Sequence, residues 1–114
     1  MNVVDPLIIR EFVEPPCAEF EIKVPRELFY LQGHFPEQPV LPGVVQVHWA
    51  IQLAKLRLGL LSSFVGIEAL KFHRIIKPEV PLKLTLEQSD ETGKLKFSYR
   101  SDFGMHSQGR ILFE

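Results

Sequence analysis

Two histidines that lie close together in the sequence, His34 and His48, have side chains that can transfer protons. His34 lies in the proline-rich run GHFPEQPVLP (33–42), and His48 lies in the apolar segment GVVQVHWAIQ (43–52) that follows directly. An imidazole has an unperturbed pKa of about 6.5, so near neutral pH it can serve as a general base or as a general acid. The chemistry that this stretch indicates first is therefore acid–base catalysis by a pair of histidines.

A metal centre is not expected at these histidines. The chain has 4 histidines and a single cysteine, Cys17, and no H-x-x-x-H pair links the histidines. One cysteine excludes both a cysteine-based zinc site and an intrachain disulfide. His73 and His106 lie in no motif, and we expect both to be ordinary residues.

The composition is that of a globular protein, with 46% hydrophobic and 24% charged residues. A length of 114 residues favours a single domain over 1–114. The net charge of −1 gives no electrostatic reason to expect nucleic acid or an anionic membrane as a partner. The first residues, MNVVDPLIIREF, lack the features of a signal peptide, and no apolar run reaches membrane-spanning length. We therefore expect a cytoplasmic protein without membrane insertion.

The elements that position the histidines can be predicted from the periodicity of apolar residues. Residues 43–60 form a helix, since Val44, Val47 and Ile51 recur at helical spacing and Gly59 suits a helix end. The helix carries few polar side chains before residue 55, so we expect it to be buried on most sides. Alternating or β-branched runs predict strands at 6–14, 18–24, 64–78, 80–89, 94–101 and 106–114, with a turn at 102–105. An antiparallel sheet wrapped around one central helix, an α+β arrangement, satisfies this order.

The run GHFPEQPVLPGV resembles the signature of the 3-hydroxyacyl-[acyl-carrier-protein] dehydratases, a hot-dog-fold family of type II fatty-acid synthesis. Their pattern reads roughly G-H-F-P-G-x-P-V-x-P-G, followed by apolar residues, an acidic residue and a glutamine four positions later. The matching residues are Gly33, His34, Phe35, Pro36, Pro39, Val40, Pro42, Gly43 and Gln52. The segment LKFHRIIKPEVPLKLTLE (70–87) also resembles the next part of the family. The resemblance implies the hot-dog fold, a highly curved sheet around a long central helix.

Two positions depart from the family pattern. Glu37 replaces a glycine, and His48, fourteen residues after His34, occupies the position of the acidic residue. Either histidine has taken over the role of the acid, or dehydration is lost. A subgroup with LPGVVQ and no family acid, the stand-alone dehydratases of aryl-polyene gene clusters, is the one that this chain resembles most.

The resemblance assigns catalytic roles to three residues. His34 is the candidate base, with its second ring nitrogen donating to a backbone carbonyl near Val40. Gly43 is the candidate oxyanion donor, because helix N-termini have free N–H groups and glycine permits close approach; alternatively, Pro42 and Gly43 merely start a helix. His48 is the candidate acid, placed by the resemblance on a neighbouring subunit's helix across a homodimer interface. The alternative for His48 is a core histidine.

Further residues are candidates for substrate or partner binding. Phe35, Val40 and Leu41 are assigned to the acyl site, although such apolar residues could equally be core. Gln52 lies one helical turn beyond His48 and could orient it or a water, or simply pack. We expect Gln46 and Trp49 to be packing residues.

A basic run on the strand after the helix is the candidate docking site for the carrier protein. Lys71, Arg74 and Lys77 could attract an acidic acyl carrier protein and the phosphate of its phosphopantetheine arm, or could form a solvated strand face. The substrate would be covalently carried by this arm, so the resemblance implies no cofactor of the enzyme's own.

The function that the resemblance implies is dehydration of 3-hydroxyacyl-[acyl-carrier-protein] thioesters to trans-2-enoyl thioesters, in fatty-acid or aryl-polyene synthesis. Two alternatives stay open. One is an acyl thioesterase, although residues 42–54 lack the carboxylate that hydrolytic hot-dog enzymes usually carry on the helix. The other is a non-catalytic acyl-binding subunit, for which the loss of the acid at position 48 is the main argument.

Overall fold

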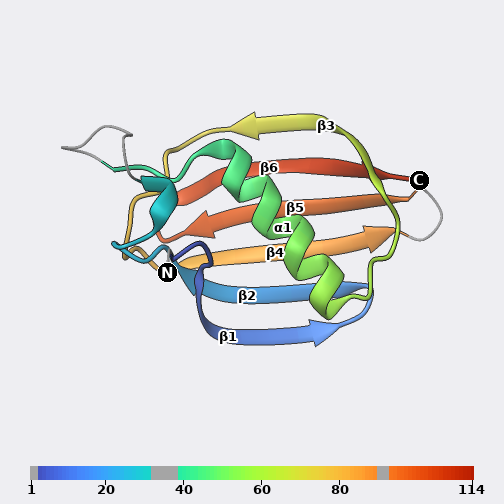
Figure 1. Ribbon diagram of the computed structural model, residues 1–114, viewed down its shortest axis with the longest axis horizontal. Helices are drawn as coiled ribbons and strands as arrows, with labels where there is room; N and C mark the ends of the chain where they lie inside the picture. Colours follow the sequence, from blue (N-terminus) through green and yellow to red (C-terminus); the bar gives the residue numbers. More distant parts are fainter. Residues whose placement is uncertain (1–2, 32–38, 90–92) are drawn as a thin grey trace.

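The computed structural model of this chain describes residues 3–31, 39–89 and 93–114. Within these ranges the chain forms one antiparallel sheet of six strands with a single long helix lying across one face (Figure 1). The strands are β1 (Leu7–Glu14), β2 (Cys17–Lys23), β3 (Phe64–Phe72), β4 (Leu82–Ser89), β5 (Lys94–Ser101) and β6 (Gly104–Phe113), and the helix is α1 (Gly43–Arg57). Their order in the sheet is β1-β2-β4-β5-β6-β3, so β1 and β3 are the two edges. The predicted α+β arrangement of a sheet around one central helix is confirmed.

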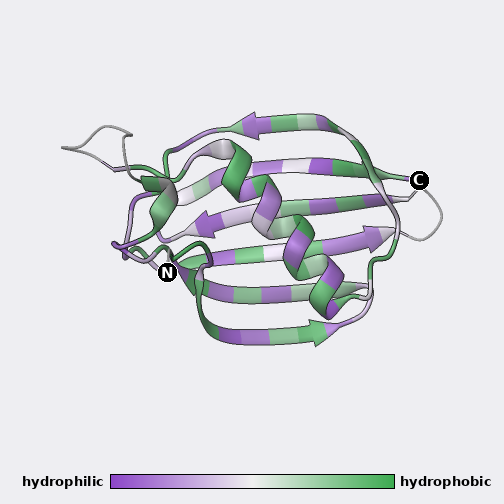
Figure 2. Ribbon diagram, in the orientation of Figure 1, coloured by the Kyte–Doolittle hydropathy of each residue, from purple (hydrophilic) through white to green (hydrophobic). Residues whose placement is uncertain are grey.

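The core lies between α1 and the inner face of the four central strands. Alternate residues of β2, β4 and β5 are buried, and Figure 2 shows the matching alternation of hydrophilic and hydrophobic residues along the strands. The helix contributes Trp49, Ala50 and Leu53 to this core. The Trp49 indole also donates a hydrogen bond to the Val4 carbonyl, 3.1 Å away, which ties the N-terminal segment to the helix.

The helix begins and ends at identifiable signals. Pro42 precedes its first turn in an extended conformation, and the Val45 N–H donates to the Pro42 carbonyl. The helix ends at Arg57, three residues before the predicted end, and Gly59 follows with a φ of 68°. Arg57 pairs with Glu11 of β1 at 2.8 Å, so the last turn of the helix is attached to that edge of the sheet.

Three predictions about the elements are wrong in part. The strand predicted over 64–78 ends at Phe72, because the chain then leaves the sheet edge and buries Ile76 in the core. The turn predicted at 102–105 is shorter, and β6 already begins at Gly104. The helix is buried along one side only: Val44 is 76% exposed and His48 is exposed as well.

Candidate active site

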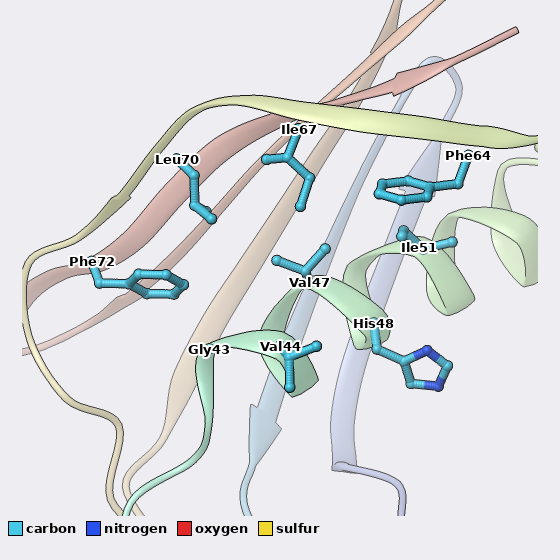
Figure 3. Close-up of a pocket in the computed structure, with 9 residues that line it drawn as sticks. All are labelled: Gly43, Val44, Val47, His48, Ile51, Phe64, Ile67, Leu70 and Phe72. Atoms are coloured by element: carbon cyan, nitrogen blue, oxygen red, sulfur yellow. The ribbon is translucent and has the colours of Figure 1, made fainter.

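An apolar cavity of about 410 Å³ lies between α1 and the edge strand β3, and we call it the α1–β3 trough. The residues that line it are Gly43, Val44, Val47, His48 and Ile51 from the helix and Phe64, Ile67, Leu70 and Phe72 from the strand (Figure 3). Among these lining residues, His48 is the one with a titratable side chain. The trough can therefore hold an apolar chain beside a single proton-transferring group.

His48 stands on the open side of the helix. Its side chain is exposed in the single chain, and its ring points away from the side chains of β3 (Figure 3). Within the described ranges the ring makes no hydrogen bond or ion pair. The alternative of a satisfied core histidine is therefore wrong for this chain. His34 and Phe35, the other predicted residues of this part of the site, lie outside the described residues, as does Glu37.

Gly43 is the first residue of α1, where the N–H groups have no partner within the helix. The ring of Phe72 lies directly against it: a Cβ atom at position 43 would be 2.5 Å from the Phe72 Cζ atom and 2.9 Å from Cε1. Such distances are shorter than any ordinary carbon–carbon contact. A side chain at position 43 would therefore have to displace the Phe72 ring, and glycine is the residue that permits this packing unchanged.

Two further cavities lie near the trough. A cavity of about 310 Å³ shares Gly43 and Phe72 with the trough. Its other lining residues are Leu41, Gln46, His73, Arg74 and Ile75. A third cavity, of about 380 Å³, shares Arg74 and Ile75 with the second. The second cavity thus adjoins the apolar trough, and the third cavity, which has a basic lining, adjoins the second.

The three predicted docking residues are divided by the structure. Arg74 and Lys77 both line the third cavity, whose remaining walls include the apolar side chains of Val80 and Phe103. Lys71 instead lines a separate cavity of about 240 Å³, which it shares with Lys96, Gln108 and Arg110. Arg74 and Lys77 are thus one group, and Lys71 belongs to another.

The remaining predicted substrate residues lie around the start of the helix. Val40 and Gln52 are half-buried. Leu41 is buried in the core and also lines the second cavity. Its backbone N–H donates to the Ile76 carbonyl at 2.8 Å, so the chain before the helix is joined to the chain after β3.

Gln46 is buried, as predicted for a packing residue, but its polar contacts could not be predicted. Its side-chain Nε2 donates to the Leu41 carbonyl at 3.2 Å, and its Oε1 accepts from the Ser107 hydroxyl at 2.6 Å. The Tyr99 hydroxyl donates to the Gln46 backbone carbonyl at 2.6 Å. Burial raises the pKa of the Tyr99 phenol well above its usual value, so this donor keeps its proton.

His106, expected to be an ordinary residue, is buried and both of its ring nitrogens form hydrogen bonds. Its Nδ1 donates to the Ile75 carbonyl at 2.9 Å, which fixes the tautomer, and its Nε2 accepts from the Ser101 hydroxyl at 2.6 Å. The His106 carbonyl accepts from the N–H groups of His73 and Arg74. His106 therefore holds the segment that carries Arg74 against β6.

Among the residues that the structure describes, no three potential metal ligands of the His, Cys, Asp or Glu type lie together. In the same ranges, no helix combines the length and the apolar character that crossing a membrane would need.

The fold and the site define a class: a hot-dog protein whose central helix carries a titratable residue beside an apolar trough. The comparisons with known proteins specify the family. A model of the ApeI-like family, described as ApeI dehydratase, matches residues 11–110. This protein belongs to the ApeI-like dehydratase family.

Individual proteins support the assignment. A chain of the dehydratase heterocomplex ApeI:P from Xenorhabdus doucetiae matches with a TM-score of 0.88 and 33% identity over 96% of this chain and 98% of that one. An uncharacterized protein from Erwinia carotovora subsp. atroseptica matches with a TM-score of 0.83 and 30% identity over 96% and 95%. The 3-hydroxyacyl-[acyl-carrier-protein] dehydratase FabZ of Clostridium novyi is 41% identical over 66 residues, which are 52% of this chain and 46% of the relative. The match thus spans about half of that relative's length.

Proposed function

We propose that this protein removes water from 3-hydroxyacyl thioesters carried by an acyl carrier protein, giving trans-2-enoyl thioesters, in fatty-acid or aryl-polyene synthesis. The observation that carries the proposal is the position of His48: it is the titratable side chain at an otherwise apolar trough, on the same helix whose N-terminus is Gly43. Family membership and the names of the relatives, ApeI dehydratase and FabZ, support the same reaction.

The reaction divides between three groups. His34 takes the proton from the carbon next to the thioester carbonyl, and the negative charge grows on the carbonyl oxygen. The Gly43 N–H, with the positive end of the helix dipole behind it, stabilises that oxygen. As the electrons form the C2–C3 double bond, the hydroxyl group leaves C3 and takes a proton from His48, so that the products are the enoyl thioester and water.

A second hot-dog subunit completes the site in this proposal. The trough is open on one side, and Val44, Phe64 and Phe72 are all about half exposed or more in the single chain. In the described ranges β3 is a sheet edge with no strand on its outer side, and such an apolar edge is normally covered by a partner. We propose a homodimer in which His48 of one subunit faces His34 of the other. The related ApeI:P protein is a heterocomplex, so an unlike hot-dog partner is the alternative outcome.

The three neighbouring cavities suggest how the substrate lies. The acyl chain occupies the apolar trough, the thioester lies at Gly43, and the phosphopantetheine arm leaves past Phe72 toward Arg74 and Lys77. The phosphate of the arm and the acidic carrier protein are attracted to these two cations. No cofactor of the enzyme's own enters this scheme, and the expected cytoplasmic location stays a prediction.

Charge reversal tests this orientation. We expect Arg74→Glu and Lys77→Glu to raise KM for the carrier-protein substrate about tenfold while kcat changes little, because the charges steer docking rather than chemistry. The measurement is steady-state kinetics with the carrier-protein thioester and with a short thioester of the same acyl group that lacks the arm. Lys71→Glu is the matched comparison and should have the smaller effect. Equal effects of all three changes on both substrates would contradict the assigned path.

The proposed reaction itself is tested by turnover of a 3-hydroxyacyl-carrier-protein by the purified chain, followed by mass spectrometry of the acyl group. We expect loss of one water with wild type and a rate at least about 100-fold lower with His34→Ala, since a general base contributes that much. Release of free acid would indicate a thioesterase instead. An inert wild-type protein that still binds the acyl carrier protein would indicate the acyl-binding subunit.

A further inference from the structure

A buried hydrogen-bond network joins the first turn of α1 to the sheet. Gln46, Tyr99 and Ser107 are each at most 3% exposed. Ser107 donates to the Gln46 side chain at 2.6 Å, and the Gln46 amide in turn donates to the Leu41 carbonyl at 3.2 Å. Tyr99 holds the backbone of the same residue through its carbonyl at 2.6 Å. Strands β5 and β6 are thereby connected to the first turn of the helix through one glutamine.

Leu41 is held by this network two residues before the helix begins. Its carbonyl accepts from Gln46, and its N–H donates to the Ile76 carbonyl at 2.8 Å, so the residue is fixed on both sides. Pro42 and Gly43 come next, and Pro42 restricts the backbone that precedes it. The Pro42 carbonyl, which lies in the same peptide as the Gly43 N–H, accepts from the Val45 and Gln46 N–H groups at 3.1 and 3.2 Å. The direction of the Gly43 N–H therefore depends on this first turn together with the anchored Leu41 before it.

We propose that Gln46 is a positioning residue that aims the Gly43 N–H at the thioester oxygen by fixing the Leu41 carbonyl. This inference rests on the proposed function. Gln46 is 3% exposed and lines the second cavity beside Gly43, but in this proposal it touches no reacting atom and acts through Leu41. Oxyanion stabilisation depends on a donor that is already in place when charge develops, so a loosened Leu41 lowers kcat more than it affects substrate binding.

Glutamine is suited to this position because its amide presents a donor and an acceptor at the same end. Ser107 uses the acceptor and Leu41 uses the donor. Methionine has a similar length and supplies neither. A neutral glutamic acid supplies both, whereas its carboxylate has no donor and would place a negative charge against the Leu41 carbonyl.

The experiment compares Gln46→Met and Gln46→Glu with wild type in kcat and KM across pH. We expect Gln46→Met to lower kcat roughly 10- to 100-fold at every pH, with KM changed less than about threefold. For Gln46→Glu, the ratio of its kcat to that of wild type should be close to one at acidic pH and fall as pH rises and the buried carboxyl ionises. Because ionisation of a buried carboxyl can also unfold the protein, the folded fraction is measured at each pH and the ratio is taken per folded molecule. A purely structural glutamine would leave this corrected ratio flat. Gln88→Met and Gln88→Glu on β4 are matched controls and should keep wild-type kcat.

Amide hydrogen exchange provides a readout that does not need activity. We expect Gln46→Met to speed exchange of the Leu41 amide while the amides of β4 exchange as in wild type. If wild type fails to dehydrate the substrate, the proposed function fails, and the exchange data still decide whether Gln46 holds Leu41. Any of three results overturns the inference. They are a Leu41 amide that exchanges at the wild-type rate in Gln46→Met, a kcat ratio of Gln46→Glu to wild type that is independent of pH, and a Gln46→Met protein that loses thermal stability while keeping wild-type kcat.

Discussion

Replacing His48 by alanine should lower the rate of dehydration at least about 100-fold, because in the proposed mechanism the departing hydroxide then lacks its proton donor. Binding of the acyl chain should change little, since the other lining residues of the trough are apolar and stay in place. His48→Glu should recover part of the lost rate, because a carboxylic acid at this position is what the dehydratase signature contains. The measurement is single-turnover dehydration with each variant, alongside melting temperatures.

Lys55→Ala is the matched control for His48. Lys55 is an exposed residue of the same helix outside the trough, and its replacement should leave the rate unchanged. If His48→Ala dehydrates as fast as wild type, the proton donor is another group and His48 serves the partner contact instead.

Subunit mixing tests where the two histidines meet. If each site takes His34 from one subunit and His48 from the other, coexpression of His34→Ala and His48→Ala chains restores up to about a quarter of wild-type activity through mixed dimers with one intact site. Neither variant alone should show this rate. No recovery in mixed dimers confirmed by mass would place both histidines in the same subunit.

The sequence predicts the strands and the helix well because each has a clear apolar period. The alternation in β2, β4 and β5 reflects one face packed on α1 and one face in solvent, which is a local property of the chain. The strand after the helix is predicted too long because Ile75 and Ile76 continue its apolar pattern. Ile76 is buried through a tertiary contact with the segment before α1, and no local pattern encodes that contact.

The candidate site likewise has residues that a local pattern predicts and residues that only the folded structure brings together. His48 and Gly43 can be proposed as site residues from a sequence motif, because the motif depends on spacing along one helix. Gln46 could be expected to pack, but its partner Ser107 lies 61 residues away on β6, so only the folded sheet reveals the bond. The separation of Lys71 from Arg74 and Lys77 has a similar cause: the chain leaves β3 after Phe72, and the cations end up at different cavities.

The second large effect is expected at Gly43. Gly43→Ala should lower kcat about 100-fold, the typical cost of disturbing one oxyanion donor. The added methyl group would meet the Phe72 ring at 2.5 Å and would stand beside the N–H that the thioester oxygen must reach. Phe72 is half exposed, so its ring can move aside and the melting temperature should change little. The measurements are kcat and the melting temperature of the same preparation. A lower kcat at an unchanged melting temperature indicates an effect on the site and not on the fold.

A double variant decides which contact makes glycine necessary. Phe72→Ala alone removes a side chain that lines both the trough and the second cavity and should leave more activity than Gly43→Ala does. In Gly43→Ala with Phe72→Ala the clash with the ring is gone, yet the methyl group still blocks the N–H, so kcat should stay low. If the double variant instead regains the rate of Phe72→Ala, the glycine is required only for packing against the ring. The oxyanion would then have to be stabilised by a donor other than the Gly43 N–H.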